Sequence, residues 1–517
     1  MNRKDVPRFE RLDERIARLL GDRGFLCTKD ILWNVEPWER MVEAISYHFP
    51  TNYSSIFFGR DFDLAKTRYE VTGEGLPYEV VWNFPDIPIA LLAKENPFIL
   101  NVLIDAHVRG HIDFNLRNPF MIEGRAIADI AEEARLAAAR FDEYRGMYGD
   151  TEVDRIIEIG ESLSKYQDPN RLVDEEETEE DTRKKFLAIE QEKLKAIAID
   201  FGKNATQRQE ASAAVEKRIQ ELKKKTPPRS VFDLLGYIMT HCPKHHEPWV
   251  HDIWTVQLHQ AKHQQRVMVC HMLNEGWASL WHEYAMHELF REGLIDSNEF
   301  GVFSDFHSRV CCPSRLSFNA YHIGPAFYND IRDRWNKGQF GAEYLDCTWP
   351  RKRERYIRRG FDGAGEKKIF EIASTSNDRM IYTNVELFSD EFIAEEGIYI
   401  WEGQPKNDGS VEYSIVEKNP NVMRHILASR ATLYGIPLMS VEDGNFNSNQ
   451  ELYLKHHFFG NELDPKMESG AMEHVFNAWG KPVHLETAEI TKRDDQGRPE
   501  KSKSILHTYD GKTHKFK

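Results

Sequence analysis

The chain has 517 residues, 41% of them hydrophobic and 12% aromatic, which is enough for roughly two or three domains with substantial cores. Its formal net charge of -16 argues against a nucleic-acid-binding surface and does not favour attraction to anionic lipid. The chain contains no run of about 18 apolar residues, and its first residues lack the apolar core of a secretory signal. We therefore expect a cytoplasmic protein with no membrane span and no nucleic-acid partner.

Six cysteines are spread along the chain without any C-x-x-C pair. This pattern indicates neither a disulfide framework nor a zinc ribbon. We expect most of these cysteines to be reduced and buried, where a thiol behaves as a small hydrophobic group.

The first 172 residues are predicted to form an N-terminal helical part. Apolar residues recur at helical intervals in four segments, at 10–20, 37–48, 127–144 and 153–163. A further helix is expected from about 97 through 109, after a segment that its prolines interrupt.

Residues 173–229 are predicted to form a charged linker and a helical insertion. Residues 173–185 contain almost nothing to bury, so we expect a solvated linker or an exposed helix there. A helix follows at 205–225 and ends at Pro227 and Pro228. A surface helical hairpin is the favoured interpretation, and a projecting arm or oligomer contact is the alternative.

Helical patterning returns in residues 230–380, with one or two long helices from 249 to 293 that we expect to pack on the first helical part. In residues 381–517 the pattern changes: YIWEG, LYLKHH and PVHLET are typical of strands, and 422–434 and 466–479 of helices. The predicted fold is therefore mainly α, with a smaller α+β module at the C-terminus and a His/Glu site within the large helical part.

The main functional motif is a histidine pair, His107 and His111, in IDAHVRGHIDF. Residues four apart on a helix project from one face, so both imidazoles could bind one ion at about 2.0 to 2.1 Å. Glu275, in NEGWASLWHE, is the natural third ligand. The zinc-peptidase helix has a glutamate directly after its first histidine, and Val108 stands there in this chain, so any base must come from elsewhere.

Two further groups are candidates for proton transfer. His282 lies on the same predicted helix as Glu275 and His271, and the three side chains can share a face. Glu161 lies on the predicted helix 153–163. The alternative for each histidine is an imidazole that is hydrogen-bonded to a carboxylate or carbonyl and has only a structural role.

Arg309, Asn319 and Tyr321 are candidates for orienting a polar substrate. Tyr321 is equally consistent with a packed aromatic whose hydroxyl is satisfied. The sequence has no glycine-rich phosphate loop, G-x-S-x-G elbow or dinucleotide fingerprint in a suitable context, which disfavours nucleotide-dependent chemistry and serine hydrolysis.

From about residue 10 to residue 490 the chain resembles the SpoVR family, the stage V sporulation protein R group. The segments that carry the resemblance include LPYEVVWNFPDIPIALLAKENP, AHVRGHIDFNLRNPF, VMVCHMLNEGWASLWHEYAMHELFREGLI, FNAYHIGPAFYNDI and EDGNFNSNQELYLKHHFFG. The resemblance implies a link to the spore cortex, a peptidoglycan layer, and a possible serine-protein-kinase partner. We expect many relatives to carry Asp and His where this chain has Glu158 and Glu161, so their metal preference does not transfer directly.

The leading hypothesis is a metal-dependent hydrolase or transferase that acts on an amide or peptide bond, with zinc held by His107, His111 and Glu275. A peptidoglycan peptide or its cytoplasmic precursor is the favoured substrate. One alternative is a non-catalytic scaffold or regulator that works with the kinase, in which these residues form a polar core. Another is oxygen or redox chemistry at iron, which uses the same ligand set.

Overall fold

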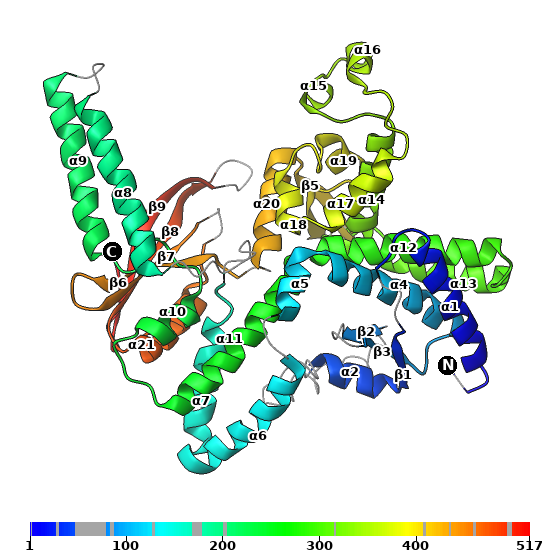
Figure 1. Ribbon diagram of the computed structural model, residues 1–517, viewed down its shortest axis with the longest axis horizontal. Helices are drawn as coiled ribbons and strands as arrows, with labels where there is room; N and C mark the ends of the chain where they lie inside the picture. Colours follow the sequence, from blue (N-terminus) through cyan, green and yellow to red (C-terminus); the bar gives the residue numbers. More distant parts are fainter. Residues whose placement is uncertain are drawn as a thin grey trace. The chain divides into compact units, whose positions relative to one another are not determined.

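The computed structural model divides the chain into two compact units, each built from two separate stretches (Figure 1). Unit 1 consists of Met1–Ala138 and His263–Tyr434, and unit 2 of Ala139–Lys262 and Gly435–Lys517. The sequence analysis expected consecutive parts with boundaries at residues 172, 229 and 380, whereas each unit combines two stretches that are separated in the sequence. The structure describes all residues except 2, 27–29, 47–78, 83–86, 127–129, 168–177, 200–203, 315–316, 407–409, 434–435, 459–461 and 494–498.

Unit 1 is mostly helical, and its core surrounds two long helices, α4 (Phe98–Arg117) and α12 (His271–Arg291). Every residue of α4 from Ile99 to Phe114 is buried, because the helix has no continuous polar face. The other helices of this unit are α1 (Val6–Gly21), α2 (Trp38–Ser46), α5 (Pro119–Ala126), α13 (Ser297–Val310), α14 (Ala320–Asn336), α15 (Ala342–Leu345), α16 (Pro350–Arg353), the 3-10 turn η1 (Glu354–Tyr356), α17 (Ala364–Ala373), α18 (Asp378–Thr383), α19 (Asp390–Glu395) and α20 (Pro420–Leu433).

A small sheet in unit 1 is the main feature that the sequence analysis missed. Its strands lie in the order β1 (Leu32–Glu36), β3 (Ile89–Ala93) and β2 (Glu79–Trp82), with β1 parallel and β2 antiparallel to β3. Strands of four or five residues show too little alternation to be recognised, and this pairing joins distant segments. A second pair, β4 (Ile400–Pro405) with β5 (Val411–Glu417), contains the predicted YIWEG strand.

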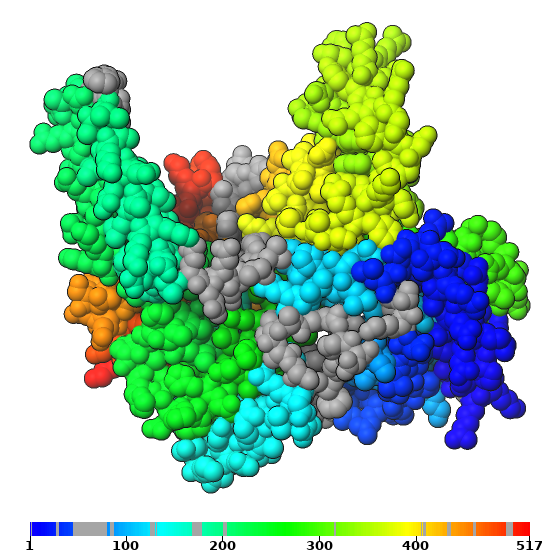
Figure 2. All heavy atoms as spheres, viewed as in Figure 1, coloured from blue at the N-terminus to red at the C-terminus, as the bar shows by residue number. Residues whose placement is uncertain are grey.

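One segment of unit 1 projects from its surface. Figure 2 shows that the segment containing α15 and α16 projects from the rest of the unit. Trp349, between these two short helices, is 75% exposed.

Unit 2 contains a five-stranded mixed sheet with order β10-β9-β8-β7-β6. The strands β7 and β8 are parallel, and helix α21 (Pro465–Trp479) connects them. The predicted strands LYLKHH and PVHLET fall in β7 and β8, so the α+β character of the C-terminal region is confirmed. The strands are β6 (Met439–Phe446), β7 (Glu451–His456), β8 (Val483–Arg493), β9 (Pro499–Tyr509) and β10 (His514–Phe516).

The remaining helices of unit 2 include a long hairpin, α8 (Glu179–Ala198) and α9 (Ala205–Lys224), whose helices lie side by side (Figure 1). The described part of the predicted charged linker is the start of α8, which is an exposed helix, and residues 173–177 lie outside the described residues. The other helices are α7 (Asp150–Leu163) and α10 (Leu234–His241), while α6 (Ile130–Tyr148) and α11 (Pro248–Met268) each cross a unit boundary.

The five described cysteines are free thiols, but only Cys270 is buried, and Cys312 is exposed. The expectation that most cysteines are buried is therefore wrong for these positions, because three of the five lie at helix ends or in loops that stay partly open to solvent. Among the described residues, no helix has the length and apolar character needed to cross a membrane.

Acid is expected to destabilise unit 2 through His456 on β7. Burial lowers the pKa of this imidazole to about 4, and its Nδ1 lies 2.9 Å from Thr487 Oγ1. Because the unfolded histidine titrates near 6.5, this contribution to stability is complete above about pH 6.5 and is lost as the pH falls toward 4.

We expect this loss to be roughly 1 to 2 kcal/mol after allowance for solvent screening. Urea unfolding between pH 7 and pH 4 measures it, with His456→Gln as the comparison. If both proteins lose stability equally over this range, His456 is not the source of the effect.

Candidate metal centre

Helices α4, α12 and α14 approach one another closely because small residues lie where they cross. A β-carbon added at Gly110 of α4 would lie 2.5 Å from Ala278 Cα on α12. One added at Gly324 of α14 would lie 2.5 Å from Gly276 Cα. Larger side chains would therefore separate the backbones. These contacts bring the histidine pair of α4 against the face of α12 that carries Glu275.

A buried carboxylate fixes the rotation of α4 relative to α12. Asp113 accepts a hydrogen bond from the Trp277 indole nitrogen at 2.9 Å and from Arg117 Nε at 2.7 Å. It also accepts one from the backbone N–H of Leu26 at 2.6 Å. Hydrogen bonds to an ionised group are among the stronger ones in proteins, so Asp113 holds the two helices in one register.

The first turn of α12 is capped by a residue that is distant in sequence. Cys270, at the N-cap position, makes no side-chain cap hydrogen bond. Instead, the carboxylate of Asp378 accepts hydrogen bonds from the backbone N–H groups of Met272, at 2.7 Å, and Leu273, at 3.0 Å. Asp378 thus satisfies two buried donors that the helix itself leaves without partners.

Replacing Asp378 with alanine is expected to destabilise the protein by about 2 kcal/mol or more, because two buried N–H groups lose their acceptor. Asp296→Ala is the matched control, since Asp296 caps the exposed start of α13 and its loss should cost only about 1 kcal/mol. The midpoint of urea unfolding measures both changes. An equal loss of unfolding free energy in the two variants would show that the burial of the Asp378 hydrogen bonds does not increase their contribution to stability.

The three predicted ligands converge in unit 1. His107 Nε2 and His111 Nε2 are 3.0 Å apart, and Glu275 Oε2 lies 3.4 Å from the first and 3.5 Å from the second. Tetrahedral ligands at about 2.0 Å from an ion are separated by about 3.3 Å from one another. The three atoms therefore have the mutual spacing that one small divalent cation requires, and they form a candidate metal site.

The protonation states also suit a cation. Burial lowers the pKa of His111 to about 4 although Glu275 opposes the shift, so this imidazole is neutral at pH 7. Burial disfavours ionisation of Glu275, but the neighbouring imidazoles outweigh it and hold its pKa at about 2. Neutral imidazole and ionised carboxylate are the forms that bind metals. Among the described residues, the buried Oε2 atom of Glu275 accepts no hydrogen bond and has the two imidazole nitrogens as its near neighbours, so a bound cation would satisfy it.

The side chains of the cluster differ in their exposure to solvent. The side chains of His107 and His111 are 4% and 7% exposed, whereas that of Glu275 is 13% exposed. His271, one turn earlier on α12, is 45% exposed, and its Nδ1 lies 3.9 Å from Glu275 Oε1. The exposure of this group of side chains is therefore greatest beside His271.

A chain of imidazoles extends from the opposite side of His107. His107 Nδ1 and His282 Nδ1 are 2.9 Å apart, and His282 Nε2 lies 2.8 Å from His307 Nδ1 on α13. Burial lowers the pKa of His282 well below its usual value, so its ring is neutral. His282 therefore fixes the orientation of the His107 ring, as the outer partners of metal-binding histidines do.

Tyr321 and Asn319 lie at the start of α14. The Tyr321 ring stacks on His107, with ring centroids 6.0 Å apart. The Asn319 side chain is held by the backbone, because its Nδ2 donates to Val310 O at 2.8 Å and to Cys312 O at 3.0 Å and its Oδ1 accepts from Tyr321 N. Asn319 thus caps α14, and Tyr321 forms one wall of the cluster.

Arg309 and Glu161 each contact residues of their own unit that do not belong to the cluster. Arg309 pairs with Asp305 on the exposed face of α13, where its side chain is 72% exposed. Glu161 belongs to unit 2, on α7, where its Oε1 lies 3.5 Å from Gln257 Nε2. Conversely, the sequence analysis missed His307, because its spacing along α13 gives no pattern that links it to His282.

Comparison with known proteins places the chain in a family. A family model described as SpoVR like protein matches residues 4–436. The chain belongs to the SpoVR-like family. Among curated relatives, the uncharacterized protein YcgB of Escherichia coli (strain K12) is 25% identical over 410 residues, which are 74% of this chain and 76% of that protein. No solved structure matches. The SpoVR-like match includes all three candidate ligands and ends before β6.

Proposed function

We propose that the SpoVR-like chain is a metal-dependent hydrolase or transferase that acts on an amide or peptide bond, with His107, His111 and Glu275 as the metal ligands. The observation that carries the proposal is the convergence of three candidate ligand atoms, one of which is a buried carboxylate oxygen that accepts no hydrogen bond from the residues that the structure describes. A divalent metal bound there supplies a Lewis acid that polarises an amide carbonyl and lowers the pKa of water towards about 7.

The protein groups around the cluster have distinct roles in this proposal. His282 holds the His107 ring in place and, with His307, offers a path for protons away from the ligands. His271 lies at the solvent-exposed side, where it can exchange a proton with a substrate that binds next to Glu275. Glu161 on α7, whose Oε1 lies 3.5 Å from Gln257 Nε2, is the alternative candidate for assisting proton transfer.

Zinc is the favoured metal, and iron is the alternative, because two histidines and one carboxylate serve both. The family resemblance makes a peptidoglycan peptide or its cytoplasmic precursor the first substrate class to test. The decisive experiment measures the metal content of untagged protein purified without chelator and then its activity on defined peptides. Protein that contains no metal and gains no thermal stability when zinc or ferrous iron is added would rule out the proposal.

A second candidate function is a non-catalytic scaffold or regulator that acts with a serine-protein-kinase partner. The burial of His107, His111 and His282 favours it, because a satisfied polar core can serve only to fix helix packing. The metal measurement separates the two functions. A scaffold would tolerate replacement of the whole cluster by apolar residues of similar volume, whereas a metal enzyme would lose both its metal and its activity.

A further inference from the structure

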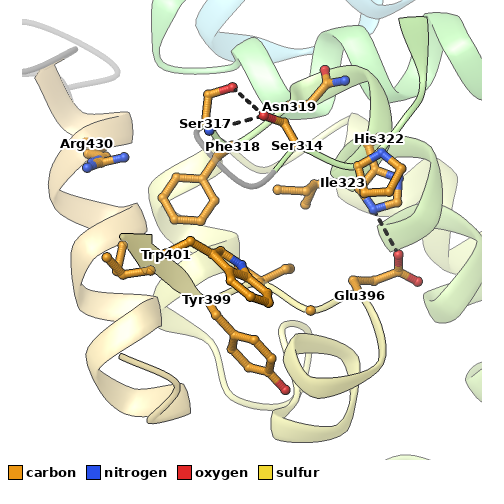
Figure 3. Close-up of a pocket in the computed structure, with 14 residues that line it drawn as sticks. Ser314, Ser317, Phe318, Asn319, His322, Ile323, Glu396, Tyr399, Trp401 and Arg430 are labelled. Atoms are coloured by element: carbon orange, nitrogen blue, oxygen red, sulfur yellow. Dashed lines mark hydrogen bonds and ion pairs between the residues drawn. The ribbon is translucent and has the colours of Figure 1, made fainter. Parts of the chain in front are cut away.

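Unit 1 contains a cavity of about 280 Å³ that none of the metal ligands lines. It lies between the segment leading into α14, the segment Glu396–Trp401 and helix α20 (Figure 3). This volume is at the lower end of the range for small-molecule sites, so it suits a ligand about as large as a dipeptide.

Two opposite charges line this cavity. Figure 3 shows Arg430 on one side and Glu396 on another, with the aromatic residues Phe318, Tyr399 and Trp401 between them. Among the described residues, no carboxylate pairs with Arg430, whose guanidinium carbon lies 5.2 Å from the centroid of the Phe318 ring. The aromatic wall thus orients a guanidinium whose hydrogen-bond donors remain available.

The carboxylate side of the cavity is rigidly built. Glu396 follows α19, and Gly397 adopts a φ of +61°, which a residue with a side chain rarely accepts. The N–H of Ile398 donates to Ile393 O at 3.0 Å and so closes the end of the helix. Glu396 Oε2 is thereby held 3.2 Å from His322 Nε2. Among the described residues, its second oxygen has no hydrogen-bond or ion-pair partner, so it can accept from a cationic group of a ligand.

We propose that this cavity binds a short peptide with free ends, about the size of a dipeptide. The peptide carboxylate lies on Arg430, its ammonium group on Glu396, and an apolar side chain against Trp401 and Tyr399. A guanidinium matches a carboxylate in geometry and charge, and the aromatic rings favour an apolar group. A purely anionic ligand would be repelled by Glu396, and a purely apolar one would bury both charges without partners.

The first turn of α14 connects the cavity to the candidate metal centre. His322 and Ile323 line the cavity, whereas Tyr321, on the same turn, stacks on His107. That the bound peptide is a substrate or product of the metal centre rests on the function proposed above. Binding of the peptide itself requires only the cavity and is independent of the metal.

Isothermal calorimetry on the full chain with L-Ala-L-Phe tests the proposal. The same peptide with an amidated C-terminus, or with an acetylated N-terminus, is expected to bind at least about tenfold more weakly, because each loses one charge-assisted interaction. Arg430→Gln should weaken binding of the free dipeptide by a similar factor. The amidated peptide, which lacks the carboxylate, should bind to this variant as tightly as to the wild-type protein. Arg359→Gln, at an exposed arginine that does not line the cavity, is the matched control and should bind normally.

Binding that survives in the His111→Ala variant supports the cavity as the site and separates it from the metal proposal. The peptide proposal is overturned if the wild-type protein shows no binding up to about 10 mM dipeptide, a limit that corresponds to negligible affinity. It is equally overturned if the amidated peptide binds as well as the free one, or if Arg430→Gln leaves the affinity unchanged. Circular dichroism of Arg430→Gln confirms that this surface variant is folded.

Discussion

Replacing His111 with alanine is expected to lower the affinity of the protein for zinc by more than about 100-fold. Loss of an outer partner of a zinc ligand already costs 10- to 100-fold, and this variant removes a ligand itself. Glu275→Gln should have an effect of the same order, because the amide keeps the shape of the side chain but loses the charge that a cation requires. Competition titration with a chromophoric chelator measures these affinities.

The neighbouring histidines provide graded controls on the same helix. His282→Gln is expected to lower zinc affinity by roughly 10- to 100-fold, because the His107 ring loses the partner that orients it. His287→Gln changes an exposed histidine of α12 and should leave zinc affinity unchanged. If all four variants bind zinc equally well, the metal is held elsewhere in the chain.

Replacing Gly276 with alanine is expected to destabilise the protein by about 3 kcal/mol. The added β-carbon would lie 2.6 Å from the backbone of Gly324, and backbone atoms cannot rotate away as a flexible side chain can. Helices α12 and α14 would have to separate, which opens the core around them. Gly276 directly follows Glu275 on the turn that faces the histidines, so zinc affinity should fall together with stability. Urea unfolding measures the loss of stability.

Gly301→Ala is the matched control for this prediction. Gly301 lies within α13, and no atom lies within 4 Å of the position that its β-carbon would take. Alanine there should leave stability unchanged or raise it by about 0.5 to 1 kcal/mol, because the unfolded chain loses conformational freedom. Equal unfolding midpoints for Gly276→Ala and the wild-type protein would mean that α12 and α14 do not touch through their backbones.

The grouping of the three candidate ligands was predictable because most of its evidence is local. The four-residue spacing of His107 and His111 shows that they share a helix face without any knowledge of tertiary structure. Glu275 required its sequence context, and the structure brings the three side chains together. The long helices and the C-terminal strands were predictable for the same reason, since their periodicity is contained within each segment.

The supporting contacts were not predictable, because they join segments that are far apart in the chain. Asp378 caps α12 from 105 residues beyond Leu273, and no local pattern marks an aspartate for that role. Strand β1 pairs Leu32 with Ile89 across a long intervening segment. Arg309 was singled out from its place in a resembling segment, and its side chain forms an exposed pair with Asp305, so its role toward a substrate stays a prediction.

The discontinuity of unit 1 has a consequence for biosynthesis. His107 and His111 lie in its first stretch, and Glu275 and His282 in its second, with the first stretch of unit 2 between them. A ribosome therefore releases the two histidines long before the carboxylate that completes the set. Chains generally fold as their domains emerge from the ribosome. While the intervening stretch is synthesised, His107 and His111 are therefore solvated or contact groups other than Glu275. With the function proposed above, metal binding would follow the synthesis of α12, and a chain truncated before α12 should bind no metal specifically at His107 and His111.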